Sequence, residues 1–155
     1  MPLKYPLHYY DEAGRLKPPL FIYIFLLFVC RGLLILAISL SFREDKESLL
    51  RLFYPQVYQF YLSLLPLLPA IYALYLVSHR NKIWANNNYQ YYRRLKPFMA
   101  LALLIDASIQ FYILARLQFS FSMSHGLAIA MAILGLMYIL RSSHLKNLIK
   151  DWSSP

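Results

Sequence analysis

Two ionisable residues stand inside long apolar segments of this chain. Arg31 interrupts the apolar run over residues 20–41, and Asp106 interrupts another over residues 97–117. A charged side chain at the centre of a bilayer costs about 2.5–3.5 kcal/mol on insertion scales. Two kinds of chemistry could justify that cost. Either the two residues pair as a polar clamp between helices, or Asp106 takes up a proton or cation while Arg31 modulates it or binds an anion.

Gln110 follows Asp106 by one helical turn, on the same helix face, and is therefore a further candidate hydrogen-bond partner for the pair. Other catalytic patterns are missing. The four histidines are scattered, and none has an acidic or histidine partner three or four residues further on inside a predicted span, so we expect no metal ion and no cofactor. The chain has no G-x-S-x-G motif and no P-loop, and we expect it not to be an enzyme.

His125 is the one histidine with possible nucleophiles close by, at Ser122 and Ser124. A hydrolytic Ser/His pair also needs an acidic residue to orient the imidazole, and none is near in sequence. Capping and lipid-headgroup contacts are the ordinary role of such residues at a helix start. The single cysteine, Cys30, cannot form an internal disulfide, so the redox compartment cannot be inferred.

The elements that must position these residues are membrane helices. The chain has 155 residues, is 59% hydrophobic and has a mean hydropathy of +0.44, which is well outside the range of soluble domains. A helix needs about 20 apolar residues to span a bilayer. We therefore predict an all-α integral membrane bundle, a single domain over residues 1–155 with four transmembrane helices, at about 20–41, 57–78, 97–117 and 122–140.

Two further segments have apolar residues along one helical face and charges along the other. They lie at about residues 44–54 and 142–152, and we interpret both as short interfacial helices. For the first segment, a plain solvated loop is the alternative.

Pro66 and Pro69 lie within the second predicted span. Each proline removes a backbone hydrogen bond and favours a kink, so the carbonyls that it frees need partners from neighbouring helices or water. Such a kink could be a hinge or a site, but proline is also simply more frequent in membrane helices.

The fourth span carries small residues at four-residue spacing, which permits close helix approach: Gly126 with Ala130, and Ala128 with Ala132. These faces could hold a protein partner or a second copy of the chain.

Basic residues are concentrated in some connections more than others. Residues 79–96 hold five Lys and Arg residues and no acidic residue, interleaved with tyrosines. Such a composition could bind RNA by stacking, but it suits a surface of anionic lipid headgroups better, and we expect no nucleic-acid partner. Residues 1–19, 79–96 and 141–155 together carry eleven of the sixteen Lys and Arg residues. The positive-inside rule then places both termini in the cytoplasm.

This topology makes the first and third helices run in the same direction. Arg31 then lies roughly 17 Å, and Asp106 roughly 14 Å, from the cytoplasmic end of its own helix. The two depths agree within one turn, so we expect the arginine fork and the carboxylate to face each other.

Two stretches carry a family resemblance. Residues 10–19, YDEAGRLKPP, resemble the Y-D-x-x-G-x-L-K-P-P motif of a small gammaproteobacterial inner-membrane family, the YfeZ-like proteins, and residues 52–56, LFYPQ, resemble its second signature. An arginine midway along the first helix, here Arg31, also fits that family. The layout is similar over most of the chain, while the sharp motifs cover only its first half. The resemblance implies a multi-span bacterial inner-membrane protein of unknown function and supplies no catalytic residues.

Three functions compete on these grounds. The first is a non-enzymatic scaffold or accessory component that works through its helix faces. The second is a small proton-coupled transporter with Asp106 as the coupling site and the helix of Pro66 and Pro69 as its moving part. The third, a lipid-modifying enzyme, lacks any visible set of catalytic residues.

Overall fold

The computed structural model describes residues 6–11, 14–41, 51, 53–86, 89–118 and 123–153, with the backbone alone at residues 123–124. Within these ranges the regular elements are helices. Tyr10 and Leu16 also form an isolated antiparallel β-bridge. In order, they are η1 (Leu7–Tyr9), α1 (Leu20–Val29), α2 (Arg31–Ser41), α4 (Val57–Ser63), α5 (Leu67–Ser78), α6 (Arg80–Ala85), η2 (Tyr89–Arg94), α7 (Leu95–Arg116), α8 (Met123–Arg141) and α9 (Ser143–Trp152).

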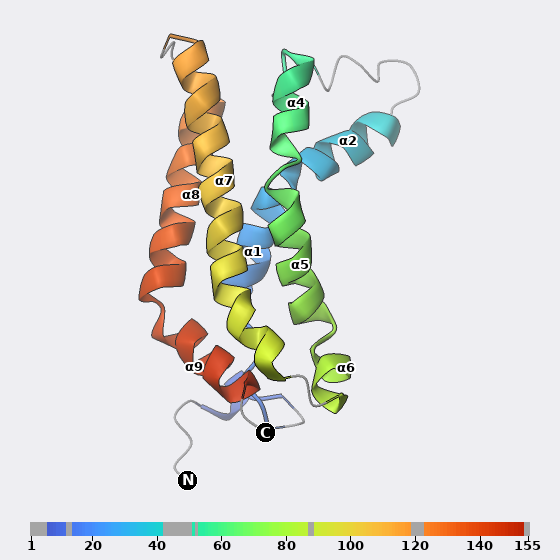
Figure 1. Cartoon of the computed structure of the whole chain (residues 1–155), viewed down its shortest axis with the longest axis vertical. Helices are drawn as coiled ribbons and strands as arrows, with labels where there is room; N and C mark the ends of the chain where they lie inside the picture. Colours follow the sequence, from blue (N-terminus) through green and yellow to red (C-terminus); the bar gives the residue numbers. More distant parts are fainter. Residues whose placement is uncertain are drawn as a thin grey trace.

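The long helices form an elongated bundle in which α7 is the central member and contacts α1, α4, α5 and α8 (Figure 1). By length and composition, two segments of the described chain can each cross a membrane alone, Val57–Ser78 and Tyr89–Arg116. The number rises to four if α1 with α2, and α8 with α9, each count as one bent span. The predicted fold class, an all-α membrane bundle, is confirmed.

The first apolar segment is not the continuous helix that the sequence predicts. α1 stops before Cys30, and α2 departs at a bend of 62° and leaves the bundle (Figure 1). Two contacts account for the break. The Arg31 side chain turns back and donates from Nη1 to the carbonyl oxygen of Phe28 at 3.1 Å. A Cβ on Gly32 would lie 2.8 Å from the Ser63 hydroxyl, so glycine lets α4 approach closely at the bend.

Pro66 ends a turn at residues 64–66 between α4 and α5, and Pro69 lies in the first turn of α5. Because proline has no N–H, the carbonyls of Leu62 and Leu65 lose their usual donors four residues ahead. Each carbonyl accepts instead from three residues ahead, Leu62 from the Leu65 amide at 3.1 Å and Leu65 from the Leu68 amide at 3.4 Å. The partners expected from neighbouring helices or water are thus replaced by a local tightening of the same segment.

The two small-residue pairs of α8 lie on different sides of that helix. Ala128 and Ala132 are buried in the bundle, whereas Gly126 and Ala130 are exposed. A Cβ placed on Gly126 would meet nothing within 4 Å. The first pair therefore serves packing within the chain, and the second pair faces outward.

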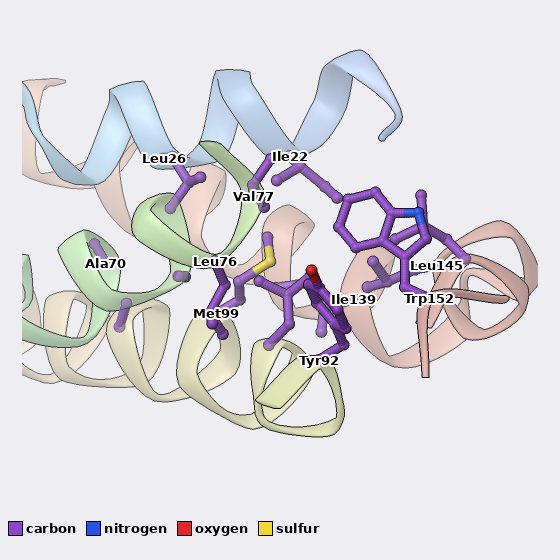
Figure 2. Packing of buried hydrophobic residues seen from close by; sticks show 14 of the residues in the cluster. Ile22, Leu26, Ala70, Leu76, Val77, Tyr92, Met99, Ile139, Leu145 and Trp152 are labelled. Atoms are coloured by element: carbon purple, nitrogen blue, oxygen red, sulfur yellow. The ribbon is translucent and has the colours of Figure 1, made fainter. Parts of the chain in front are cut away.

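At one end of the bundle α9 bends by 59° from α8 and closes the core (Figure 1). Its apolar residues Leu145, Leu148 and Trp152 are at most 2% exposed. Figure 2 shows Trp152 beside Tyr92 of η2, with the two ring centroids 5.3 Å apart. The helix predicted at 142–152 is therefore present. Its apolar face, however, packs on the protein itself, because η2 and the N-terminal segment fold beneath the bundle to meet it.

The other predicted interfacial helix, at residues 44–54, lies outside the described residues except at positions 51, 53 and 54.

Candidate functional site

The structure brings Arg31 and Asp106 together where α2 begins beside the middle of α7. Nη2 of Arg31 lies 2.7 Å from Oδ1 of Asp106, and Nη1 lies 3.1 Å from Oδ2, so the guanidinium holds both carboxylate oxygens. The Asp106 side chain is 1% exposed and that of Arg31 is 22% exposed. The guanidinium also lies over the Phe28 ring, 4.5 Å from its centroid. This is the bidentate geometry for which arginine is suited and lysine is not.

The break before α2 makes this pairing possible. The backbone turns at Cys30, so the side chain that follows it leaves the direction of α1 and reaches α7. Arg31 thereby satisfies the Phe28 carbonyl and the Asp106 carboxylate with one guanidinium. The pair ties the bend of the first apolar segment to the central helix of the bundle.

Gln110 does not join that pair as the sequence predicts. Its side chain is 5% exposed, and its Oε1 lies 2.7 Å from Nδ1 of His125, so that an imidazole protonated at Nδ1 donates to the amide oxygen. The reason is that α8 lies against α7 at this turn and brings His125 beside Gln110. Gln110 and His125 therefore form a second polar link, between α7 and the first turns of α8.

This link also bears on the hydrolytic hypothesis for His125. The ring nitrogen that an orienting acid would hold contacts a neutral amide instead. An amide can fix the ring but cannot stabilise an imidazolium as a carboxylate does. Among the described residues, moreover, no three His, Cys, Asp or Glu side chains lie close enough to hold a metal ion.

Two buried polar residues of α4 were not predicted from the sequence: Gln59 and Ser63, which are 2% and 3% exposed. The Ser63 hydroxyl donates to the Phe60 carbonyl at 2.7 Å, while Oε1 of Gln59 has no hydrogen-bond partner among the described residues. Their four-residue spacing within an apolar run was the available signal, because it repeats the spacing of Asp106 and Gln110.

A second cluster of polar and aromatic residues, also not predicted from the sequence, lies at the end of the bundle that carries α9. The described part of residues 10–19 forms a tight turn: the Asp11 amide donates to the Arg15 carbonyl at 2.8 Å, and Gly14 adopts a positive φ of 71°. The turn docks on α9, where the Leu16 amide donates to Oδ2 of Asp151 at 3.0 Å. The described part of the stretch that resembles the YfeZ-like motif thus binds the N-terminal segment to the last helix, α9.

Arginines and aromatic rings surround this docked turn. Arg15 lies over the Trp84 ring at 3.9 Å from its centroid, and Arg80 forms an ion pair with Asp11. Asp11, Arg15, Arg80 and Trp84 line a cavity of about 320 Å³, together with Asn81, Tyr92 and Trp152.

Comparisons with known proteins agree with the resemblance to the YfeZ-like proteins. The chain is 40% identical over 76 residues to "Inner membrane protein YfeZ" of Escherichia coli (strain K12), a match that covers 49% of this chain and 50% of that relative. The match thus spans about half the length of the curated relative. No solved structure matches this chain. The family described as "Protein of unknown function (DUF2919)" matches over residues 5–151, which is nearly the whole chain, and the protein belongs to that family.

Proposed function

We propose that this protein is a non-enzymatic scaffold or accessory component of the bacterial inner membrane, in which the Arg31–Asp106 pair fixes how the helices meet. The observation that carries this proposal is that the Asp106 carboxylate is buried and paired. Its side chain is 1% exposed and both of its oxygens are held by one guanidinium. A carboxylate that exchanges protons or cations with water must be reachable by water, whereas a clamp must be dry and fully paired.

The name of the curated relative supports the inner-membrane location, and the charge distribution supports an orientation with both ends cytoplasmic. The described N-terminal turn, α6, η2 and α9 gather at one end of the bundle (Figure 1). Most of the chain's Lys and Arg residues belong to these segments or adjoin them. This end is the one that we assign to the cytoplasm.

A proton-coupled transporter using Asp106 is the second candidate, and one observation favours it. The first apolar segment is broken at Cys30 between α1 and α2, and the helical pattern of the second is interrupted at residues 64–66, between α4 and α5. Transporters build their ion and substrate sites at discontinuous helices of this kind. For this function the Arg31 guanidinium would have to release Asp106 during the cycle.

Membrane abundance of charge variants separates the two candidates. We expect Arg31→Ala and Asp106→Ala each to be depleted several-fold in a quantitative immunoblot of the membrane fraction, because an unpaired buried charge costs about 3–5 kcal/mol. The double variant, or the swap Arg31→Asp with Asp106→Arg, should recover abundance. Arg116→Ala is the matched control, since Arg116 is exposed and contacts Tyr112 on its own helix.

Normal abundance of every variant would remove the basis of the clamp. In that case proton release from the purified protein upon addition of candidate substrates, lost in Asp106→Asn, would favour the transporter.

A further inference from the structure

A groove between α1 and α5 opens beside the cavity of the docked turn. Its volume is about 590 Å³, and it shares Asp11 and Arg80 with that cavity. Lys17 and Ser78 also line it, and an apolar wall is formed by Tyr23, Leu74 and Val77. From the geometry we infer that this groove binds one anionic glycerophospholipid, with the phosphate at Lys17 and Arg80 and an acyl chain along the apolar wall.

The polar and apolar residues of the groove lie at different positions along α1 and α5, in the same order as the headgroup and acyl layers of a bilayer. Lys17 precedes the start of α1 at Leu20, and Ser78 is the last residue of α5, so the polar mouth lies at the ends of both helices. Tyr23 and Leu74 lie about one turn further in, roughly 5–6 Å along their helices. Polar donors at the helix ends, followed by an apolar wall one turn deeper, are what a phosphate and the start of an acyl chain require.

The charges at the mouth favour an anion. Lys17 and Arg80 contribute two positive charges, and Asp11 contributes one negative charge that is already paired with Arg80. Within the described residues the Lys17 side chain is exposed and forms no hydrogen bond or ion pair, so its ammonium can turn toward a ligand. The start of α1 adds the positive end of a helix dipole at the same level. A juxtamembrane cation attracts an anionic headgroup by about 1 kcal/mol, which corresponds to roughly fivefold in affinity.

Arg80 is held in place for this role. It is bound to the Asp11 carboxylate, its Nε donates to Oδ1 of Asn81 at 3.3 Å, and its guanidinium lies 5.5 Å from the centroid of the Trp152 ring. A side chain positioned in this way loses little further freedom when a phosphate binds. The inference does not depend on whether the protein is a scaffold or a transporter. The leaflet concerned is the one at the end of the bundle with α9.

Native mass spectrometry of the full chain in detergent, titrated with dioleoyl-phosphatidylglycerol, tests the site. We expect a one-to-one complex that forms more readily than with dioleoyl-phosphatidylcholine. Lys17→Gln should weaken it roughly fivefold and Lys17→Arg should restore it. Lys146→Gln is the matched control, because Lys146 is exposed on α9 at the same end and outside the groove. Equal binding of both lipids, or no effect of Lys17→Gln, would overturn the headgroup assignment.

The acyl chain is tested separately. Leu74→Trp should fill the groove and reduce phosphatidylglycerol binding, whereas Leu68→Trp, at a position 72% exposed on the same helix and outside the groove, should not. Inorganic phosphate at millimolar concentration should compete poorly with the lipid. Full competition by inorganic phosphate, or unchanged binding in a folded Leu74→Trp protein, would show an anion site without a lipid groove and would contradict the inference. If Leu74→Trp does not fold, the competition experiment and the Lys17 series still decide.

Discussion

The indole Nε1 of Trp152 donates to the carbonyl oxygen of Leu16 at 3.0 Å, in a part of the molecule where both residues are buried. This bond joins residues 136 positions apart, and the Arg15 side chain and the Leu16 amide bind Asp151 beside it. The last helix and the N-terminal turn are therefore one structural unit, which closes the bundle at the end that we assign to the cytoplasm.

Loss of this bond should destabilise the protein while leaving its apolar packing largely in place. Trp152→Phe keeps a large ring but leaves the buried Leu16 carbonyl without its indole donor, which costs about 1–3 kcal/mol. We expect a lower melting temperature in detergent and faster proteolysis within the N-terminal turn. Tyr58→Phe, which removes a hydroxyl from a residue 41% exposed on α4, is the control. An unchanged melting temperature and proteolysis rate in Trp152→Phe would mean that the two ends are not energetically linked.

Arginine at position 31 should not be replaceable by lysine. The variant Arg31→Lys keeps the positive charge, but an ammonium cannot hold both Asp106 oxygens and the Phe28 carbonyl as one planar fork does. We expect the free energy of unfolding to fall by about 1–3 kcal/mol, less than for Arg31→Ala. Arg116→Lys makes the same change at an exposed site and should be neutral. Equal stability of the two lysine variants would show that charge alone, without bidentate geometry, maintains the clamp.

The contact between Gln110 and His125 should appear as an energetic coupling between α7 and α8. Gln110→Leu, His125→Leu and the double variant form a double-mutant cycle, and directly bonded residues couple by about 0.5–3 kcal/mol. We expect the two single changes together to cost more than the double change, because each single variant leaves one polar group unpaired. Simple additivity of the unfolding free energies would contradict a hydrogen bond between them.

Two glycines of α8 should respond in opposite ways to alanine. A Cβ on Gly135 would lie 2.8 Å from Leu103 Cδ1 and 3.0 Å from two atoms of the Phe25 ring, whereas one on Gly126 meets nothing within 4 Å. Over-packing costs about 1–3 kcal/mol, and replacing glycine within a helix gains up to about 1 kcal/mol. The melting temperatures should therefore rank Gly126→Ala above the parent chain and the parent chain above Gly135→Ala. If Gly135→Ala ranks first, α1, α7 and α8 are packed less closely than the structure has them.

The membrane class, the all-α fold and the approximate helix positions were predictable from the sequence. Bilayer thickness imposes a length on each apolar segment, and apolar runs of that length are visible residue by residue. The partnership of Arg31 and Asp106 was also predictable, because two opposite charges at matching depths have few alternatives in an apolar medium. The helix at 142–152 was predictable on a separate ground, its one-sided apolar pattern.

Tertiary packing decided the rest. No periodicity distinguishes a continuous helix over 20–41 from one that breaks at Cys30. The break depends on the position of Asp106, which binds Arg31, and on the close approach of Ser63 to Gly32. Likewise, Gln110 pairs with His125 because α8 lies against α7 at that turn.

The apolar face of α9 shows the same division between sequence and structure. Its residues are readable as one face from their spacing, but the same pattern suits a lipid surface and a protein surface equally well. The choice was made by Leu16 and Tyr92, which come from distant parts of the chain and cover that face. Local sequence specifies which groups need to be buried or paired. Their partners come from segments far apart in the chain, and those contacts exist only once the helices have packed.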